Sequence, residues 1–294
     1  MEGYNSITQK SQHKAPLVNH LGEFLRSRRG RLSPEDVGVP SYGRRRVSGL
    51  RREELAQLAG VSVTYYTRLE QGQSQNASDS IIESLARALR LTPDERTHLF
   101  ALAHPNPVKR VIPSDPESPN KGALNLLLAM ESVPAIILGR RNDILAWNKA
   151  GHILLAGHLD FEAPTHKTER PNMVRMLFLD LPTRKLYRDW ELEAATAVAS
   201  LRYIAAQFPD DARLQDLIDE LNTGSQDFAR LWNQHTVRLC TSGIKKLHHP
   251  EVGNMELSYE ALHLPEDDGQ RFLTHSALPG SSSQDTLRVL LNTI

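Results

Sequence analysis

Apolar side chains recur at intervals of three and four residues through most of the first hundred positions, a spacing that predicts amphipathic helices. In the first of these helices, residues 17–29, the side chains of Leu21, Phe24 and Leu25 share one face, and arginines follow at the end. The other helices are expected at residues 51–59, 63–71, 78–89 and 93–103. This series of five short helices predicts an all-α domain.

A proline-rich stretch separates this helical domain from the rest of the chain. Residues 104–121 contain five prolines, and proline is excluded from the interior of a regular helix. We therefore predict a helical domain at 17–103, a linker at 104–121 and a second domain at 122–294.

The second domain combines two kinds of pattern. Helices are expected at residues 123–130, 148–156, 173–179, 183–206, 212–222 and 226–233. Extended runs are expected at residues 134–138, 144–147, 237–247, 255–259, 271–277 and 286–291. The polar residues Arg140 to Asp143 separate the first two extended runs by the length of a hairpin turn. Strands on both sides of a helical middle predict an α+β fold with an antiparallel sheet.

Gly60 lies between the second and third predicted helices. Two helices that meet at a steep angle need a residue in the turn whose side chain does not clash, and glycine meets that need. The apolar residues that we expect to form a small core around this turn are Leu55, Leu58, Val61, Tyr66 and Leu69. The segment therefore predicts a helix-turn-helix.

The third helix turns a different set of side chains outward, namely Val63, Thr64, Tyr65 and Arg68. In a helix-turn-helix these positions enter the major groove, where hydroxyl, apolar and guanidinium groups contact base edges. Ser62 and the first backbone amides of the helix can hold a phosphate. Arg51 and Arg52 lie where the preceding helix crosses the DNA backbone. The alternative is a helical bundle that binds nothing, in which the arginines only solvate the surface.

Charge is distributed unevenly along a chain whose net charge is zero. Residues 1–110 hold 17 Lys and Arg against 11 Asp and Glu, whereas the remainder is acidic. A basic front half favours contact with a polyanion there and not in the second domain. The single cysteine, the polar N-terminus and the lack of a long apolar run lead us to expect a cytoplasmic protein that makes no membrane contact.

Several segments of the helical domain are shared with a known family: GLRREEL (49–55), LAGVS (58–62), YYTRLEQG (65–72) and LARAL (85–89). On these segments, residues 17–103 resemble the XRE (Cro/C1-type) helix-turn-helix proteins. The resemblance implies a transcriptional regulator that binds double-stranded operator DNA, with base contacts from Val63, Thr64, Tyr65 and Arg68. It also implies a basic loop at Arg44, Arg45 and Arg46. Because one such domain is too small for tight specific binding, we expect a homodimer that spans two half-sites.

The second domain carries its own set of shared segments: WN (147–148), LFLD (177–180), YRDW (187–190), VASLR (198–202) and HPEVG (249–253). On these segments, residues 123–277 resemble the ligand-binding domain of MmyB-like regulators, which has a PAS-like fold. The resemblance implies sensing of a small effector, with a fatty acid or another apolar molecule as the expected class. The residues that we expect at the pocket are Trp147, Asn148, Asn172, Phe178, Trp190, Arg202, Phe228 and Trp232.

Alternatives remain for the second domain. The aromatic residues serve equally well as core, and the domain is then a dimerisation or partner-protein module without a ligand. An enzyme is not expected, because Cys240 lacks a histidine at a known spacing and Ser281 to Ser283 lack a nucleophile-elbow pattern. Adjacent His248 and His249 on an extended run point to opposite faces, so we predict no metal site. Without a phosphate-binding glycine loop, we predict no cofactor.

Overall fold

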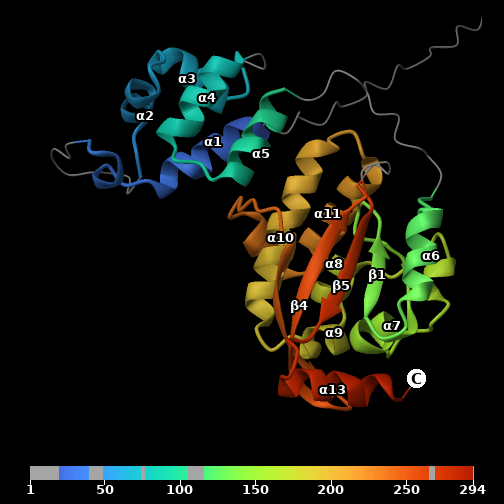
Figure 1. Cartoon of the computed structure of the whole chain (residues 1–294). Helices are drawn as coiled ribbons and strands as arrows, with labels where there is room; N and C mark the ends of the chain where they lie inside the picture. The colour runs from blue at the N-terminus through green and yellow to red at the C-terminus, as the bar shows by residue number, and fades with distance from the viewer. Residues whose placement is uncertain (1–19, 40–48, 74–76, 105–115, 265–268, 294) are drawn as a thin grey trace, which may run out of the picture. The chain divides into compact units, whose positions relative to one another are not determined.

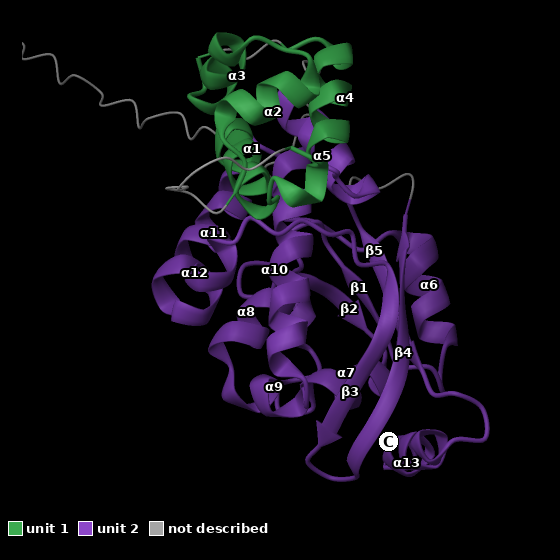
Figure 2. Ribbon diagram, turned by 90° about the vertical axis from the view of Figure 1, so that its left-hand side faces the viewer, with its two compact units in different colours: residues 1–89 green, residues 90–294 purple. Residues whose placement is uncertain are grey.

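The structure, a computed structural model, describes residues 20–39, 49–73, 77–104, 116–264 and 269–293. The chain divides into two compact units, residues 1–89 and 90–294 (Figure 2). The first is helical and the second combines helices with one antiparallel sheet, so the predicted fold classes are confirmed. None of the described helices has both the length and the apolar character needed to cross a membrane.

The first unit is built from short helices that pack on one another. Its elements are α1 (His20–Arg31), the 3-10 helix η1 (Glu35–Val37), α2 (Arg52–Ala59), α3 (Val63–Glu70) and α4 (Asp79–Ala88). Helix α3 packs against α1 and α2, and α2 also packs against α4 (Figure 1). The core is formed by Phe24, Leu25, Leu55, Tyr66, Leu69, Ile82 and Leu85, all fully buried. Helices this short are unstable alone in water, so burial of these side chains holds the unit together.

The turn between α2 and α3 depends on Gly60, whose φ of +68° lies in the left-handed region that side chains disfavour. The next N–H, of Val61, donates to the carbonyl of Ala56 at 3.0 Å and closes the end of α2. The Oγ of Ser62 accepts the N–H of Tyr65 at 3.1 Å and begins α3. The predicted helix-turn-helix is therefore formed by the expected residues.

The prediction that Leu58 belongs to the core is wrong. Its side chain is 40% exposed, whereas Leu55, Ala56 and Ala59 are buried. Ala59 lies four residues after Leu55 and takes the inward position on the next turn, which leaves Leu58 at the edge of the apolar face. Val61 is half-buried.

The second unit alternates helices with the strands of one sheet. Its helices are α5 (Pro93–Ala103), α6 (Lys121–Ala129), α7 (Lys149–Ala156), η2 (Ala163–Thr165), α8 (Met173–Leu179), α9 (Leu181–Leu186), α10 (Trp190–Gln207), α11 (Ala212–Gly224), α12 (Gln226–Trp232) and α13 (Ser282–Leu291). Its strands are β1 (Ala135–Leu138), β2 (Ile144–Trp147), β3 (Ser242–His249), β4 (Gly253–His263) and β5 (Arg271–Ser276). Helix α5 packs on α10 within this unit.

The strands form a five-stranded sheet in the order β2-β1-β5-β4-β3, with every neighbouring pair antiparallel. The hairpin predicted at Arg140 to Asp143 joins β1 to β2. It is closed by the Gly139 N–H, which donates to the Asp143 carbonyl at 2.9 Å. Asn142 takes a φ of +68° in this turn, a conformation that asparagine tolerates better than most residues.

The two faces of the sheet are covered differently. Helix α6 covers one face, where Ala123 and Leu127 pack with Ile137 and Phe272. Helices α8, α10, α11 and α12 lie on the other side (Figure 2) and enclose the larger core. That larger core contains the aromatic side chains predicted at the ligand pocket: Trp147, Phe178, Trp190 and Phe228 are buried in it, and Trp232 packs against it.

Some predicted elements of this unit are wrong in extent or type. Residues 183–206 form two helices, because the chain extends at Tyr187 and pairs there with Leu247 of β3. The extended run expected at 237–247 begins as a strand only at Ser242.

The final run, residues 286–291, is part of helix α13 and not extended. The Oγ of Ser281 accepts the N–H of Gln284 at 3.3 Å and caps the first turn. Leu287 and Leu290, three residues apart, are both buried, which is the spacing of one helix face.

Candidate DNA-binding face and ligand cleft

Helix α3 presents a continuous outward face in the first unit. Val63, Thr64 and Arg68 are exposed and Tyr65 is half-buried, whereas Tyr66 and Leu69 point into the core. The helix therefore separates its sides as predicted: one holds the fold and the other is open to solvent. A methyl-bearing, a hydroxyl and a guanidinium side chain on one helix face are groups that contact base edges in a major groove.

A buried carboxylate holds α3 in place beneath that face. Glu70, at the end of α3, is fully buried; its Oε1 accepts the Nε–H of Arg29 at 2.7 Å, and its Oε2 accepts the Nε–H of Arg52 at 2.6 Å. Arg29 belongs to α1 and Arg52 to α2, so one side chain ties all three helices together. Arg29 also donates through Nη1 to the Leu50 carbonyl at 2.6 Å. The orientation of α3 is thus fixed by charge-assisted hydrogen bonds as well as by its core face.

This network changes the acidity of its members. Burial alone acts to raise the pKa of Glu70, but the hydrogen bonds from Arg29 and Arg52 outweigh it, and the pKa of Glu70 is lowered. Burial raises the pKa of the Tyr66 phenol, and the neighbouring Glu70 carboxylate raises it further. At neutral pH Glu70 therefore stays ionised and Tyr66 stays neutral.

The other predicted DNA contacts of the first unit are Ser62, Arg51, Arg52 and the basic loop. Ser62 uses its Oγ as the acceptor that caps α3, which leaves its O–H free to donate. Arg51 is exposed, and its backbone N–H donates to the Glu54 carboxylate at 2.6 Å. The side chain of Arg52 is 39% exposed and is engaged by Glu70. The basic loop of Arg44, Arg45 and Arg46 lies outside the described residues.

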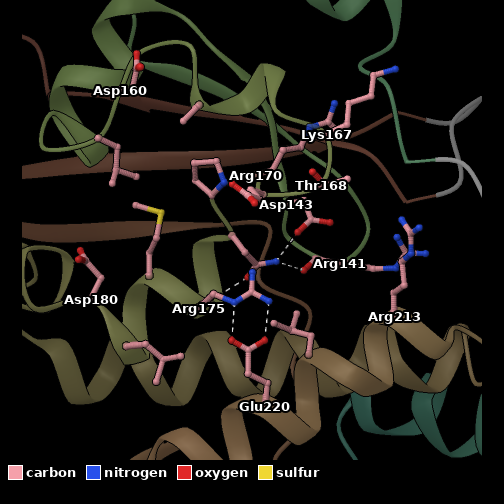
Figure 3. Close-up of a pocket in the computed structure, with 18 residues that line it drawn as sticks. Arg141, Asp143, Asp160, Lys167, Thr168, Arg170, Arg175, Asp180, Arg213 and Glu220 are labelled. Atoms are coloured by element: carbon pink, nitrogen blue, oxygen red, sulfur yellow. Dashed lines mark hydrogen bonds and ion pairs between the residues drawn. The ribbon is translucent and has the colours of Figure 1, made fainter.

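A cleft of about 800 Å³ opens in the second unit (Figure 3). Helix α8 contributes Arg175, Met176 and Leu179 to it, and α11 contributes Arg213, Leu217 and Glu220. The remaining walls are Arg141, Asp143, Leu159, Asp160, Ala163, Lys167, Thr168, Glu169, Arg170, Pro171, Asn172 and Asp180. The cleft therefore combines an apolar wall with many charged groups.

Some of these charged groups are separated by sign along the cleft. Figure 3 shows Asp160 and Asp180 toward one end of the cleft and Lys167 and Arg213 toward the other. Between them, Arg175 and Glu220 form a bidentate pair: Nε donates to Oε1 at 2.8 Å and Nη2 donates to Oε2 at 2.7 Å. The side chains of this pair are 41% and 44% exposed, so they are open to solvent within the cleft.

A second buried carboxylate orients the helix α11 that lines this cleft. Asp211 accepts the Nε–H groups of Arg140 at 2.9 Å and Arg141 at 2.8 Å, and its Oδ1 also accepts the N–H of Leu214 in the first turn of α11. Burial acts to raise the pKa of Asp211, but the hydrogen bond and charge of Arg141 outweigh it, and the pKa is lowered. The β1–β2 turn is therefore bonded directly to the start of α11.

Comparison with protein families finds a match for the region of the cleft and for the region of the helix-turn-helix. Residues 120–290 match the family model described as the MmyB-like transcription regulator ligand binding domain. The chain belongs to the MmyB-like transcription regulators. Residues 20–99 match a helix-turn-helix domain, so this MmyB-like protein is a DNA-binding transcription regulator with a ligand-binding domain. Comparison with curated proteins gives no match.

The predicted family is confirmed, but the domain limits of this MmyB-like regulator remain predictions. The helix-turn-helix match runs to residue 99, inside α5, whereas α5 packs with α10 in the unit that begins at residue 90. The Oδ2 of Asp94 in α5 accepts the N–H of Leu239 at 3.0 Å, a further bond within that unit. The limits 17–103 and 122–294 therefore stay predictions.

The structure brings most of the predicted ligand-binding aromatics together as a packed group. The ring of Phe178 lies edge-on to Trp190 and to Phe228, with centroids 5.8 and 5.1 Å apart. Phe228 stacks on Trp232 at 5.6 Å, and the Arg202 guanidinium lies 3.9 Å from the Trp232 centroid. None of these five residues lines the cleft described above. Their assignment to a ligand stays a prediction.

The remaining predicted ligand residues hold backbone groups. Trp147 donates through Nε1 to the Phe161 carbonyl at 2.8 Å. The Asn148 amide accepts from Ala135 and Gly151 and donates to two carbonyls, so its capacity is used within the fold. Asn172 caps α8 and also lines the cleft.

The sequence analysis did not identify the charged residues of the cleft. Arg175 and Glu220 are separated by 45 positions, and their pairing depends on how α8 and α11 pack. A usable signal was the helical spacing of Arg213, Leu217 and Glu220, which places all three on one face of α11.

Proposed function

We propose that this regulator binds operator DNA through the outward face of α3, with Val63, Thr64, Tyr65 and Arg68 at base edges. The observation that carries the proposal is that Glu70 fixes α3 from below while that face stays open to solvent. Ser62, Arg51, Arg52 and the loop of Arg44, Arg45 and Arg46 are proposed to contact phosphates. We further propose a homodimer on two half-sites about 34 Å apart, and a cytoplasmic role in binding and not in catalysis.

The DNA contact is tested by substituting one arginine. Duplexes selected by the purified protein from a random pool supply the specific site, and scrambled versions supply the reference. Arg68→Ala should weaken specific binding by about 1–3 kcal/mol and blur the selected sequence. Arg87→Ala on α4, also an exposed arginine, is the matched control and should leave the selected sequence unchanged. If Arg87→Ala alters the preference and Arg68→Ala does not, the assigned face is wrong.

We also propose that the effector of the second unit is a small molecule with an apolar body, of the fatty-acid class. The cleft supports this, because Met176, Leu179 and Leu217 adjoin charged groups that would bind a polar head. A ligand that binds only the native state raises the melting temperature. A series of fatty acids of increasing chain length should therefore raise it in step with affinity. If none does, a dimerisation or partner-protein module becomes the better description of this unit.

A further inference from the structure

One carboxylate that lines the cleft, Glu220, is bound by an arginine of the same cleft, Arg175. Glu220 on α11 lies in plane with the guanidinium of Arg175 on α8 and accepts two N–H groups, at 2.8 and 2.7 Å (Figure 3). This fork-to-fork arrangement is the one in which arginine binds any planar carboxylate. Both side chains are more than 40% exposed, so solvent and solutes reach them through the cleft.

The neighbours of this pair are apolar on both helices. Met176 adjoins Arg175 on α8, Leu179 lies one turn further along, and Leu217 lies one turn before Glu220 on α11. Leu179 is 44% exposed, which leaves apolar surface open in the wall of the cleft. A molecule with a carboxylate at one end and a hydrocarbon body would match these two features at once.

We propose that Arg175 binds the carboxylate of the effector, and that Glu220 is an internal competitor that occupies the guanidinium while the cleft is empty. The ligand class is a monocarboxylic acid with an apolar body. This inference rests on the proposed function of the cleft and adds to it the atoms that bind the acid and the group that is displaced.

The energetics favour an exchange of this kind. An exposed ion pair contributes little to stability, so little is lost when Glu220 leaves Arg175. The incoming carboxylate takes over the bonds to Arg175, and the hydrocarbon body that covers Leu179 shields these bonds from water, so they are stronger than those of the exposed Glu220. The hydrogen bond from Arg175 lowers the pKa of Glu220, so Glu220 is ionised at neutral pH and leaves as a solvated anion.

The test measures binding of decanoate and of 1-decanol to the full-length protein by titration calorimetry. Glu220→Gln weakens the competitor and should tighten decanoate binding about two- to fivefold. Arg175→Gln removes the bidentate donor and should weaken it about tenfold or more. Arg175→Lys keeps the charge without the fork and should give an intermediate loss. Binding of 1-decanol should be the same in all of these proteins.

Asp227→Asn is the matched control. Asp227 pairs with Arg184 at 3.1 Å with comparable exposure, but neither residue lines the cleft. It should leave decanoate binding unchanged. Should Arg175→Gln unfold, Glu220→Gln and Arg175→Lys test the same point.

Three outcomes would overturn the inference, and they are distinguishable. If decanoate binds the wild type and the Arg175 variants equally, the acid is held elsewhere and the fatty-acid proposal stands. If 1-decanol binds as tightly as decanoate, the cleft selects the apolar body alone. If neither probe binds any of the proteins, this inference and the proposed effector class both fall, while the proposed DNA contact remains.

Discussion

Each of the two units holds a buried carboxylate between two arginines, but in different surroundings. In the first unit, Glu70 is buried while Arg29 and Arg52 reach the surface, with side chains 13% and 39% exposed. In the second, Asp211 and both of its arginines are buried, since the side chains of Arg140 and Arg141 are only 4% and 8% exposed.

A buried carboxylate has the same structural role in both units. In each unit the carboxylate orients a helix that presents a proposed binding face: α3, which ends at Glu70, and α11, which begins after Asp211. The difference lies in solvent access, which weakens the electrostatic contribution of the first network relative to the second. The chain supplies a way to observe the units separately, because all three tryptophans, Trp147, Trp190 and Trp232, belong to residues 90–294. Tryptophan fluorescence follows the second unit, and far-ultraviolet circular dichroism follows both.

The largest effect is expected from Asp211→Asn. This change removes the hydrogen-bonded charge on two buried guanidinium groups and leaves them only Glu117, at 3.6 and 3.9 Å, so the loss should be about 3 kcal/mol, the lower end for breaking a buried pair. Urea unfolding followed by tryptophan fluorescence should show the loss directly. Asp210→Asn, the exposed neighbour, is the control and should leave the midpoint unchanged. Equal midpoints for the two variants would contradict the role assigned to Asp211.

Glu70→Gln should cost less, about 2–3 kcal/mol, because Arg29 and Arg52 can regain water when their partner is lost. The loss should appear in circular dichroism while the tryptophan transition stays in place. Glu53→Gln on α2 is the control, since Glu53 is exposed. A shift of the tryptophan transition by Glu70→Gln would show that the units do not unfold separately, and would break the comparison.

Acid should act on the second unit before the first. Burial, together with the charge of Lys245, lowers the pKa of His275 to about 3 from an ordinary value of 6.5. Between these values the unfolded chain binds the additional proton, so the free energy of unfolding of the second unit should fall by about 1.4 kcal/mol per pH unit below 6.5. His275→Gln should flatten that slope in the tryptophan signal. A slope that survives the substitution would point to another group.

The contribution of Glu70 to the stability of the first unit changes only at a lower pH. Its stabilising contribution is complete above the ordinary value of 4.5 and is lost as the pH falls through the lowered value of the folded state. From pH 6.5 to 4.5 the tryptophan transition should therefore move while the contribution of Glu70 stays constant.

The smallest effect is expected from Arg52→Gln, about 0.5–1 kcal/mol, because its side chain is partly exposed and Arg29 remains on Glu70. Arg29→Gln should cost more, since Arg29 also holds the Leu50 carbonyl. Circular dichroism of the urea transition measures both. The reverse order would mean that exposure does not rank these arginines.

The sequence predicted those parts of the fold that local signals control. Ser62 and Gly60 fix the helix-turn-helix through a cap and a left-handed backbone, and both act within a few residues. The same holds for the hairpin at Arg140 to Asp143. The failures have a tertiary cause: the break at Tyr187 exists because β3 pairs there, and α13 replaces an expected extended run because Leu287 and Leu290 meet the core as a helix.

The site was predicted to a different extent in each unit. The outward face of α3 followed from helical spacing, because a single helix carries it. The cleft could not be predicted, because Arg175 and Glu220 are distant in sequence and their contact depends on packing. Large aromatic residues such as Trp190 and Phe228 were predicted at the pocket instead, because a pocket for an apolar ligand needs large apolar side chains. In the structure both pack against Phe178 in the core.

Asn172 belongs to the cleft and to the hairpin at the same time. Its Oδ1 accepts the first N–H groups of α8, and its Nδ2 donates to the Arg141 carbonyl and the Asp143 carboxylate. A displacement of α8 would therefore move the β1–β2 turn through the bonds of this one amide, and the start of α11 through Arg141 and Asp211. Binding of a ligand in the cleft should therefore slow the hydrogen exchange of the Asn142 amide in the turn.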